Sequence, residues 1–137
     1  MTKEEKEQLL FIDLCNRIPY NTICTSKRFD KNILVGMDDD GATFSHVDSL
    51  GQTVYELLDI IEFDVKPYLR PMSNMTEEED KEYTNIDNGS YTCPKDCAHY
   101  PASKRIDWLN AHHFDYRGLI PLGLAIEVTK ENNPYKD

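Results

Sequence analysis

The sequence has no long hydrophobic run. Its longest apolar cluster, Leu57 to Phe63, is interrupted by Asp59 and Glu62, whereas a membrane-spanning helix needs about 20 consecutive apolar residues. Residues 1–8 are mostly charged, and no apolar stretch of the kind found in secretory signals follows them. We therefore expect a cytoplasmic protein without a membrane span.

Basic residues are scarce. The chain has 15 Lys and Arg against 25 Asp and Glu, which gives a net charge of -10. Because binding to nucleic acid depends largely on Lys and Arg neutralising phosphates, we expect no direct nucleic-acid partner. The acids gather in the middle, since residues 38–64 hold eight acids and no Lys or Arg, and residues 73–88 hold six acids and one Lys. This distribution predicts two acidic surface patches, one on a β-rich segment and one on a helix.

Signatures of catalysis are also missing. The sequence has no nucleophile elbow, no H-E-x-x-H pair and no glycine-rich phosphate loop. No catalytic residue is therefore predicted, and a non-catalytic protein is favoured over an enzyme. A chain of 137 residues is long enough to bury a core without disulfides or metal, so we expect no cofactor.

One short segment has the composition of a zinc site. Cys93, Cys97 and His99 lie within seven residues, close to the C-x₂₋₄-C spacing that wraps a tetrahedral Zn²⁺, and His112 or His113 could add a fourth ligand. A second Cys-x₂-Cys pair is lacking, and in a cytosolic chain cysteines default to free thiols. A plain loop is therefore favoured, with zinc binding as the alternative.

The first half of the chain predicts a helix followed by short strands. Thr2 and Glu5 form a capping-box pattern for a helix over residues 3–16, which Pro19 ends. Residue types typical of strands follow at 22–26, 31–37, 43–47, 54–58 and 61–66, with a helix over 54–61 as the alternative for part of this region. The turn residues at 38–41 predict a hairpin. Two prolines four residues apart indicate that residues 65–72 form an extended connector and not a central strand.

The second half predicts helices and one last strand. Ser73 or Thr76 caps a polar helix over residues 77–83, residues 84–102 form a loop, and Ser103 caps a helix over residues 104–113. A short strand over residues 124–128 ends the pattern.

Together these elements predict an α+β fold: an N-terminal helix, a small antiparallel sheet or SH3-like half-open barrel, and a helical C-terminal part with a short terminal strand. Residues 1–72 form the helix and β-rich part, and residues 73–137 pack on it as part of one folding unit.

Aromatic and hydrogen-bonding residues cluster shortly before the C-terminus. Trp and Phe side chains in a small domain are usually buried, so we expect Trp108 and Phe114 in the core, with an interface as the alternative. Trp, Tyr and Arg also dominate binding hot spots. The predicted contact surface comprises Trp108, His112, His113, Tyr116 and Arg117.

Three stretches carry a family resemblance: LCNRIPY at residues 14–20, VKPYLRPMSNMTEEE at residues 65–79, and DWLNAHHFDYRGLI at residues 107–120 with GLAIE at residues 123–127. Together they resemble a family of short uncharacterised proteins of gut Bacteroidales genomes, their phages and mobile elements. The resemblance implies a genomic context, and it brings no activity, cofactor or catalytic residue with it.

Three functional hypotheses follow. The first is a small acidic, non-catalytic binding or adaptor protein of phage or mobile-element origin that acts on a host protein. The second is a mimic of nucleic acid whose acids imitate phosphates in a basic groove of its target. The third is a zinc-binding or ligand-sequestering protein that uses the Cys93, Cys97 and His99 segment.

Overall fold

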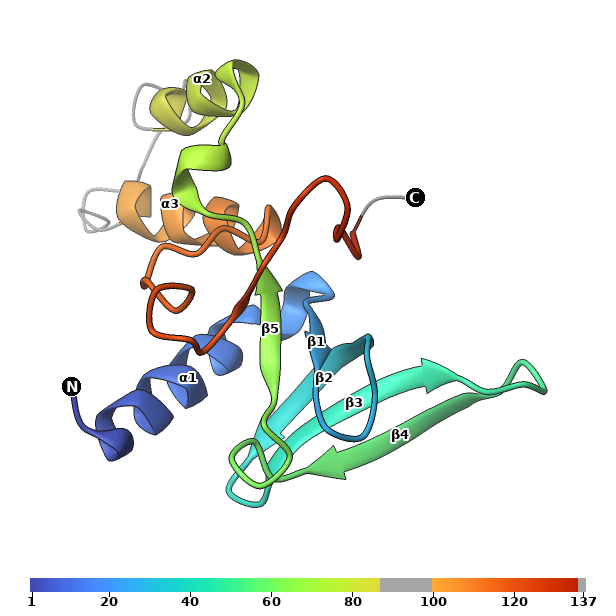
Figure 1. Ribbon diagram of the computed structural model, residues 1–137. Helices are drawn as coiled ribbons and strands as arrows, with labels where there is room; N and C mark the ends of the chain where they lie inside the picture. Colours follow the sequence, from blue (N-terminus) through green and yellow to red (C-terminus); the bar gives the residue numbers. More distant parts are fainter. Residues whose placement is uncertain (87–99, 136–137) are drawn as a thin grey trace.

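The computed structural model has the predicted α+β architecture (Figure 1). It describes residues 1–86 and 100–135, with side chains from residue 104 onward in the second range. The helices are α1 (Lys3–Arg17), α2 (Glu77–Asn85) and α3 (Tyr100–Ala111), with short 3₁₀ turns η1 (Ile18–Tyr20) and η2 (Met72–Asn74). The strands are β1 (Ile23–Thr25), β2 (Asn32–Asp38), β3 (Gly41–Val47), β4 (Thr53–Leu58), β5 (Lys66–Leu69) and β6 (Ile126–Glu127).

The strands form one mostly antiparallel sheet in the order β4-β3-β2-β1-β5-β6, in which only β5 and β6 pair in parallel. Helix α1 packs on one face of this sheet through Leu10 and Leu14, which join Leu34 and Phe44 in the core. As predicted, Thr2 caps α1 by accepting a hydrogen bond from the backbone N–H of Glu5.

The predicted hairpin turn between β2 and β3 is confirmed. The Asp38 carboxylate accepts the backbone N–H groups of Asp40 and Gly41 at 2.8 and 3.1 Å. Gly41 has a φ of +143°, and a Cβ atom at this position would lie 2.1 Å from the carbonyl oxygen of Leu58. Glycine is required here because β3 and β4 approach each other so closely. The hairpin continues into β4, which pairs with β3 without a register shift.

The predicted strand over residues 61–66 is wrong. The Asp59 carboxylate accepts the backbone N–H groups of Ile61 and Glu62, both at 2.9 Å, and so turns the chain directly after β4. Asp64 then adopts a φ of 50°. A side chain that satisfies neighbouring backbone donors competes with strand pairing, and this competition overrides the alternating pattern of the sequence.

The expectation that residues 65–72 form only a connector is also wrong. Strand β5 occupies an interior position of the sheet between β1 and β6. Pro67, which has no N–H to donate, lies opposite Cys24 of β1, while the pairing with β6 begins only at Tyr68. The proline is tolerated because it sits where its strand has a partner on one side only.

The C-terminal part follows the prediction with shifted boundaries. Thr76 caps α2 in a complete capping box with Glu79. Helix α3 begins at Tyr100 and not after Ser103, with Pro101 in its first turn, where a missing N–H is tolerated. Strand β6 is shorter than the predicted segment over residues 124–128. Among the described helices, none is both long and apolar enough to cross a membrane.

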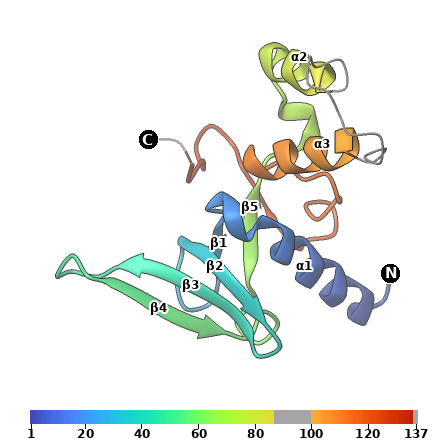
Figure 2. The same cartoon turned by 180° about the vertical axis from the view of Figure 1, so that it is seen from behind.

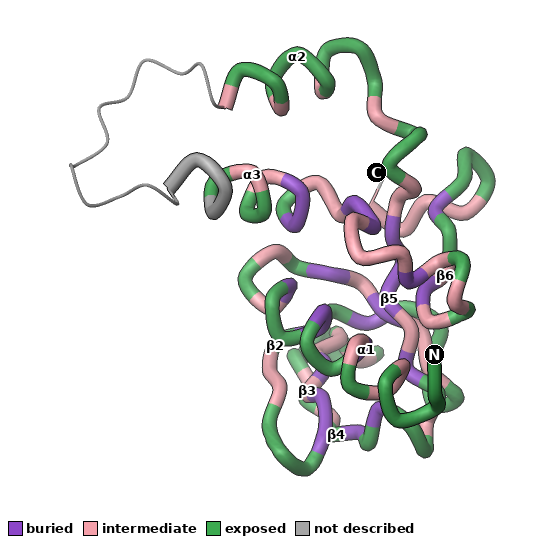
Figure 3. The backbone as a smooth tube through the Cα atoms, turned by 90° about the vertical axis from the view of Figure 1, so that its left-hand side faces the viewer, coloured by how far each residue is buried: buried purple, intermediate pink, exposed green. Residues whose placement is uncertain are grey.

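The elements divide the molecule into a packed centre and two projecting parts. The hairpin of β3 and β4 extends away from α1, and α2 with α3 lies at the opposite end (Figures 1 and 2). Burial is high along β5 and where α1 packs on the sheet, whereas α2 has no buried residue (Figure 3). Both projecting parts therefore expose surface.

Candidate functional site

The segment that follows α3 contains the predicted contact residues. His113 adopts a φ of 62°, an uncommon left-handed conformation for a residue with a side chain. The His113 carbonyl accepts from the Arg70 N–H at 2.7 Å, and the Arg70 carbonyl accepts from the Asp115 N–H at 2.8 Å. The buried carboxylate of Asp115 accepts the N–H groups of Leu119 and Ile120. These bonds fix the segment against β5.

Trp108 belongs to α3, and its side chain contacts α2 and does not lie in the core. Its indole stacks on His112 and Phe114, with ring centroids 4.0 and 5.8 Å apart. The indole N–H donates to the Glu82 carboxylate at 3.3 Å, and the Tyr83 ring lies 5.6 Å away. Trp108 is half-buried, so its predicted core position is wrong, whereas Phe114 is fully buried as expected. An indole N–H needs a polar partner, and Glu82 offers one at the surface.

Arg70 connects β5 to α2. Its guanidinium forms a bidentate ion pair with Glu79, with N–O distances of 2.8 and 2.6 Å, and it lies over the Phe114 ring at 4.1 Å. The Glu79 carboxylate also accepts the backbone N–H of Thr76. The hydrogen bonds from Arg70 lower the pKa of Glu79 to about 2, although partial burial opposes this shift.

Two further predicted contact residues, Tyr116 and Arg117, lie against a buried ion pair of α1. Arg17 donates from Nε to Asp13 at 2.7 Å and from Nη2 to the Phe114 carbonyl at 2.8 Å. Nε of Arg117 approaches the same Asp13 carboxylate at 3.3 Å. The guanidinium carbons of Arg17 and Arg117 each lie 5.1 Å from the Tyr116 ring centroid, within the range of a cation–π contact. Tyr116 and Arg117 are therefore half-buried and engaged in internal contacts.

The sequence reasoning missed Asp13 and Arg17. Both residues continue the helical spacing of Leu10 and Leu14, which places them on the buried face of α1. Charged residues of opposite sign that recur four positions apart on an apolar face are a signal for a buried ion pair, and this signal was present in the sequence.

His112 and His113 line an open cleft of about 700 Å³ together with Arg70, Thr129, Lys130 and Tyr135. The His113 ring stacks on Tyr135 at 3.6 Å. Burial, reinforced by the charge of Arg17, lowers the pKa of His113 to about 4, so this ring is neutral at pH 7. The Tyr135 hydroxyl donates to the Tyr68 carbonyl at 2.7 Å. His113 and Tyr135 thus hold the C-terminal segment against β5.

The predicted metal ligands Cys93, Cys97 and His99 lie outside the described residues. Within the described ranges, no group of three His, Cys, Asp or Glu side chains is placed to hold a metal ion. Of the cysteines in these ranges, Cys15 is exposed and Cys24 is buried, both with free thiols. Burial raises the pKa of the Cys24 thiol, which makes it unreactive.

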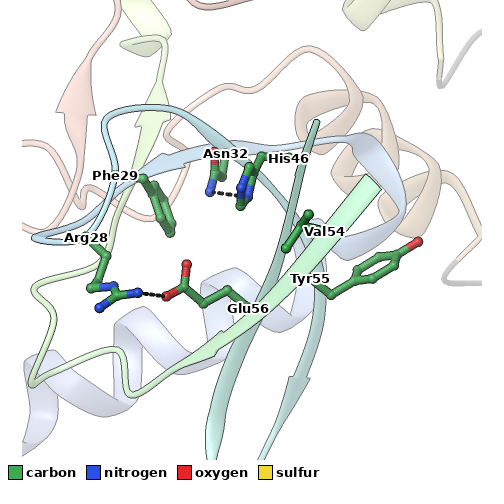
Figure 4. Close-up of a pocket in the computed structure, with 7 residues that line it drawn as sticks. All are labelled: Arg28, Phe29, Asn32, His46, Val54, Tyr55 and Glu56. Carbon is green, nitrogen blue, oxygen red and sulfur yellow. Dashed lines mark hydrogen bonds and ion pairs between the residues drawn. The ribbon is translucent and has the colours of Figure 1, made fainter. Parts of the chain in front are cut away.

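A second cavity, of about 510 Å³, lies on the β3–β4 hairpin (Figure 4). Its walls come from the β1–β2 loop and from β2, β3 and β4. The Arg28 guanidinium pairs with Glu56 at 2.7 Å across the opening, and Asn32 contacts the His46 ring at 3.4 Å. Phe29 closes the inner side by packing edge-on against Phe44 at 4.9 Å. The loop before β2 thus covers part of the sheet face that α1 leaves open.

The opposite face of the hairpin sheet carries several exposed apolar side chains. Cross-strand partners share a face, and Ile33, Ser45 and Tyr55 form one such row. Tyr55 is 66% exposed and Leu57, two positions along β4, is 50% exposed. We name this face the open sheet face; its exposed apolar residues are Ile33, Val47, Tyr55 and Leu57.

Three acids of the middle segment cap turns at the ends of the hairpin. Asp38 and Asp59 cap neighbouring turns at one end, because Gly41 and Leu58 lie side by side. Asp48 caps the tip at the other end by accepting the N–H groups of Leu50 and Gln52. The acidic helix α2 lies at the far end of the molecule (Figure 1). Asp38, Asp48 and Asp59 thus each belong to a separate turn, whereas Glu56 lies within β4 and pairs with Arg28.

No protein-family model, curated protein or solved structure matches the chain. The surface of the molecule itself is therefore the basis for a functional proposal. Two regions stand out: the segment around residues 108–117, which is engaged in internal contacts, and the open sheet face, on which Tyr55 and Leu57 are 66% and 50% exposed.

Proposed function

We propose that the protein is a small non-catalytic binding or adaptor protein and that it binds another protein through the open sheet face. The observation that carries this proposal is the exposure of Tyr55 and Leu57 on a regular sheet, at 66% and 50%. Exposed apolar side chains, aromatic ones above all, are typical of protein interfaces.

The described geometry favours this face over the predicted contact surface at residues 108–117. The side chains of Tyr116 and Arg117 surround a buried ion pair, and Trp108 stacks within its own chain. Such groups lose internal contacts when they turn toward a partner. Tyr55 also borders the cavity of Figure 4, but its ring points away from the other residues that line the cavity, and its side chain is 66% exposed.

The arrangement of acids favours an adaptor over a mimic of nucleic acid. A mimic needs acids in one stripe at the spacing of phosphates, whereas Asp38, Asp48 and Asp59 each satisfy a turn. The resemblance to proteins of Bacteroidales phages and mobile elements supports a host protein as the partner.

Photo-crosslinking in host cells tests this proposal. A photoreactive phenylalanine analogue replaces Tyr55 in one variant and, as the matched control, Ile106 in another, because Ile106 is also apolar and exposed but lies on α3. We expect one discrete crosslinked protein from position 55 and none from position 106. Crosslinking only from position 106 would move the interface to α3, and none from either position would refute protein binding.

A further inference from the structure

Strand β4 forms an edge of the sheet, and its outer side has no partner strand among the described residues. In an antiparallel pair, hydrogen-bonded and non-hydrogen-bonded residue pairs alternate. The Asp48 N–H donates to the Gln52 carbonyl at 2.9 Å, which fixes the phase of this alternation. Along the register of β3 and β4, Val54 and Glu56 therefore bond to β3.

The alternation leaves the backbone groups of the other residues pointing outward. The N–H and C=O groups of Thr53, Tyr55 and Leu57 face the free edge. The position of the Leu58 carbonyl, which lies against Gly41 of β3, agrees with this phase. The outward residues are also the ones whose side chains lie on the open sheet face, so backbone donors and apolar side chains coincide.

This edge has one of the features that protect edge strands from pairing, the charged side chain of Glu56, which is paired with Arg28. Other protective features in soluble proteins are proline, lysine, a β-bulge and a covering element. The sequence Thr53–Leu58 contains none of these residues, and its pairing with β3 is regular over its whole length. The bulge of this sheet lies in β2, between Leu34 and Gly36, and not at the edge.

We propose that the free edge of β4 receives an extended segment of the partner protein as an added strand, with Lys or Arg beside the acidic turn at its Leu58 end. This inference rests on the proposed function and specifies its partner. The added strand bonds to the outward backbone groups of Thr53, Tyr55 and Leu57. Its alternate apolar side chains pack beside Tyr55 and Leu57, as in other cases of strand addition.

Charge complementarity selects the chemistry of the segment. Asp38 and Asp59 cap the turns that meet at the Leu58 end of β4, and Asp48 lies at the other end. Residues 38–64 contain eight acids and neither Lys nor Arg. Basic residues in the added segment gain favourable interactions at these ends, whereas acidic ones are repelled.

The same charges disfavour a second copy of this chain as the occupant. Antiparallel pairing of two β4 strands brings the Asp48 end of one copy against the Asp59 end of the other. Each copy also carries a net charge of -10. Repulsion between like charges at both ends opposes such a dimer.

Synthetic peptides test the proposal. The probe is acetyl-Lys-Lys-Thr-Val-Thr-Val-Thr-Val-Lys-Lys-amide, and its charge control has Glu in place of every Lys. Two further peptides carry N-methyl groups on one or the other alternating set of central residues. We expect binding of the Lys peptide, binding of the Glu peptide weakened by about tenfold or more, and loss of binding for only one of the two methylated peptides.

Amide hydrogen exchange gives a second readout on the unmodified chain. We expect the Lys peptide to slow exchange at Thr53, Tyr55 and Leu57 and to leave Val54 and Glu56 unchanged. The variant Tyr55→Pro removes one outward N–H and is expected to abolish binding, while Tyr55→Ser keeps that N–H and is expected to retain part of it.

Several outcomes would overturn the proposal. Equal binding of both methylated peptides, or absence of the alternating protection, excludes strand addition. Crosslinking of a protein at position 55 together with either result would leave the proposed function intact and refute only the strand-addition mode. Alternating protection without peptide, accompanied by a dimer in sedimentation equilibrium, would identify a second copy as the occupant.

Discussion

Arg17 donates to both carboxylate oxygens of Asp13, at 2.7 and 3.2 Å, and neither side chain has exposed surface. The same guanidinium reaches the carbonyl of Phe114, far along the chain. One ion pair on α1 therefore fixes the segment that follows α3. Removing one partner of such a pair leaves the other charge buried without compensation.

We predict that Asp13→Asn lowers the free energy of unfolding by about 3–5 kcal/mol, the range for breaking a buried ion pair. Urea denaturation at pH 7 measures this loss. The matched control is Glu56→Gln, which breaks the more exposed pair with Arg28 and is expected to change stability by no more than about 1 kcal/mol. Equal losses in the two variants would contradict the buried role of Asp13.

A second prediction concerns Gly41. The variant Gly41→Ala places a Cβ atom 2.1 Å from a backbone oxygen, and the backbone must shift to accept it. Gly51 also has a positive φ, but a Cβ there meets nothing within 4 Å. We expect Gly51→Ala to lose about 1–2 kcal/mol of stability from conformation alone, and Gly41→Ala to lose about 1–3 kcal/mol more because of the steric clash. Thermal unfolding of both variants measures the difference.

Trp108 and Phe114 stack on each other but differ in burial, and their variants should differ accordingly. We expect Phe114→Ala to lose about 3–5 kcal/mol, since this ring is fully buried. Trp108→Ala should lose about 1–2 kcal/mol, comparable to aromatic contacts at a half-exposed site. Denaturant midpoints compare the two. A loss for Trp108→Ala as large as that for Phe114→Ala would show that the indole supports the core.

Glu79 predicts a pH dependence of stability. Its pKa is lowered from 4.5 to about 2 in the folded protein, chiefly by the hydrogen bonds from Arg70. A lowered folded-state pKa means that the stabilisation is present above the unfolded-state value and is lost as the pH falls from about 4.5 to about 2. In the Glu79→Gln variant, the melting temperature should not show this loss between pH 4.5 and about pH 2. The control is Glu78→Gln, at an exposed position on α2, and its melting temperature should depend on pH as that of the parent protein does.

The sequence predicted those parts of the fold that are decided by a few adjacent residues, and it failed where a competing local signal or longer-range contacts decide the structure. Thr2, Thr76 and the turn at Asp38 were read correctly, because caps and turns are decided by a few adjacent residues. The region after β4 was misread, because the Asp59 carboxylate supplies turn bonds that an alternating pattern does not reveal. Strand β5 was misread because the place of Pro67 in the sheet depends on which neighbours pair with it.

The candidate site was less predictable, for a related reason. Aromatic and charged residue types indicate contact surfaces, but they serve equally well inside the chain, and Tyr116 and Arg117 contact a buried ion pair. Tyr55 is exposed because no element of the described part of the chain packs over its ring. Because side chains alternate along a strand, the sequence indicates which residues of β4 share a face. Whether another element packs on that face depends on the tertiary structure.

The last prediction tests whether the acids at the Leu58 end of β4 attract a basic segment. The triple variant Asp38→Asn, Asp39→Asn and Asp40→Asn should keep its fold, because an Asn side chain also accepts the backbone N–H groups that Asp38 accepts. It should bind the Lys peptide with an association rate reduced by about tenfold at low salt, and the difference should shrink above about 0.1 M salt, where charges are screened within about 10 Å. The matched control replaces Glu77, Glu78 and Asp80 of α2, which removes the same charge far from β4. Equal rates for the two triple variants, measured by stopped-flow fluorescence with a labelled peptide, would show that net charge and not the acidic turn steers the peptide.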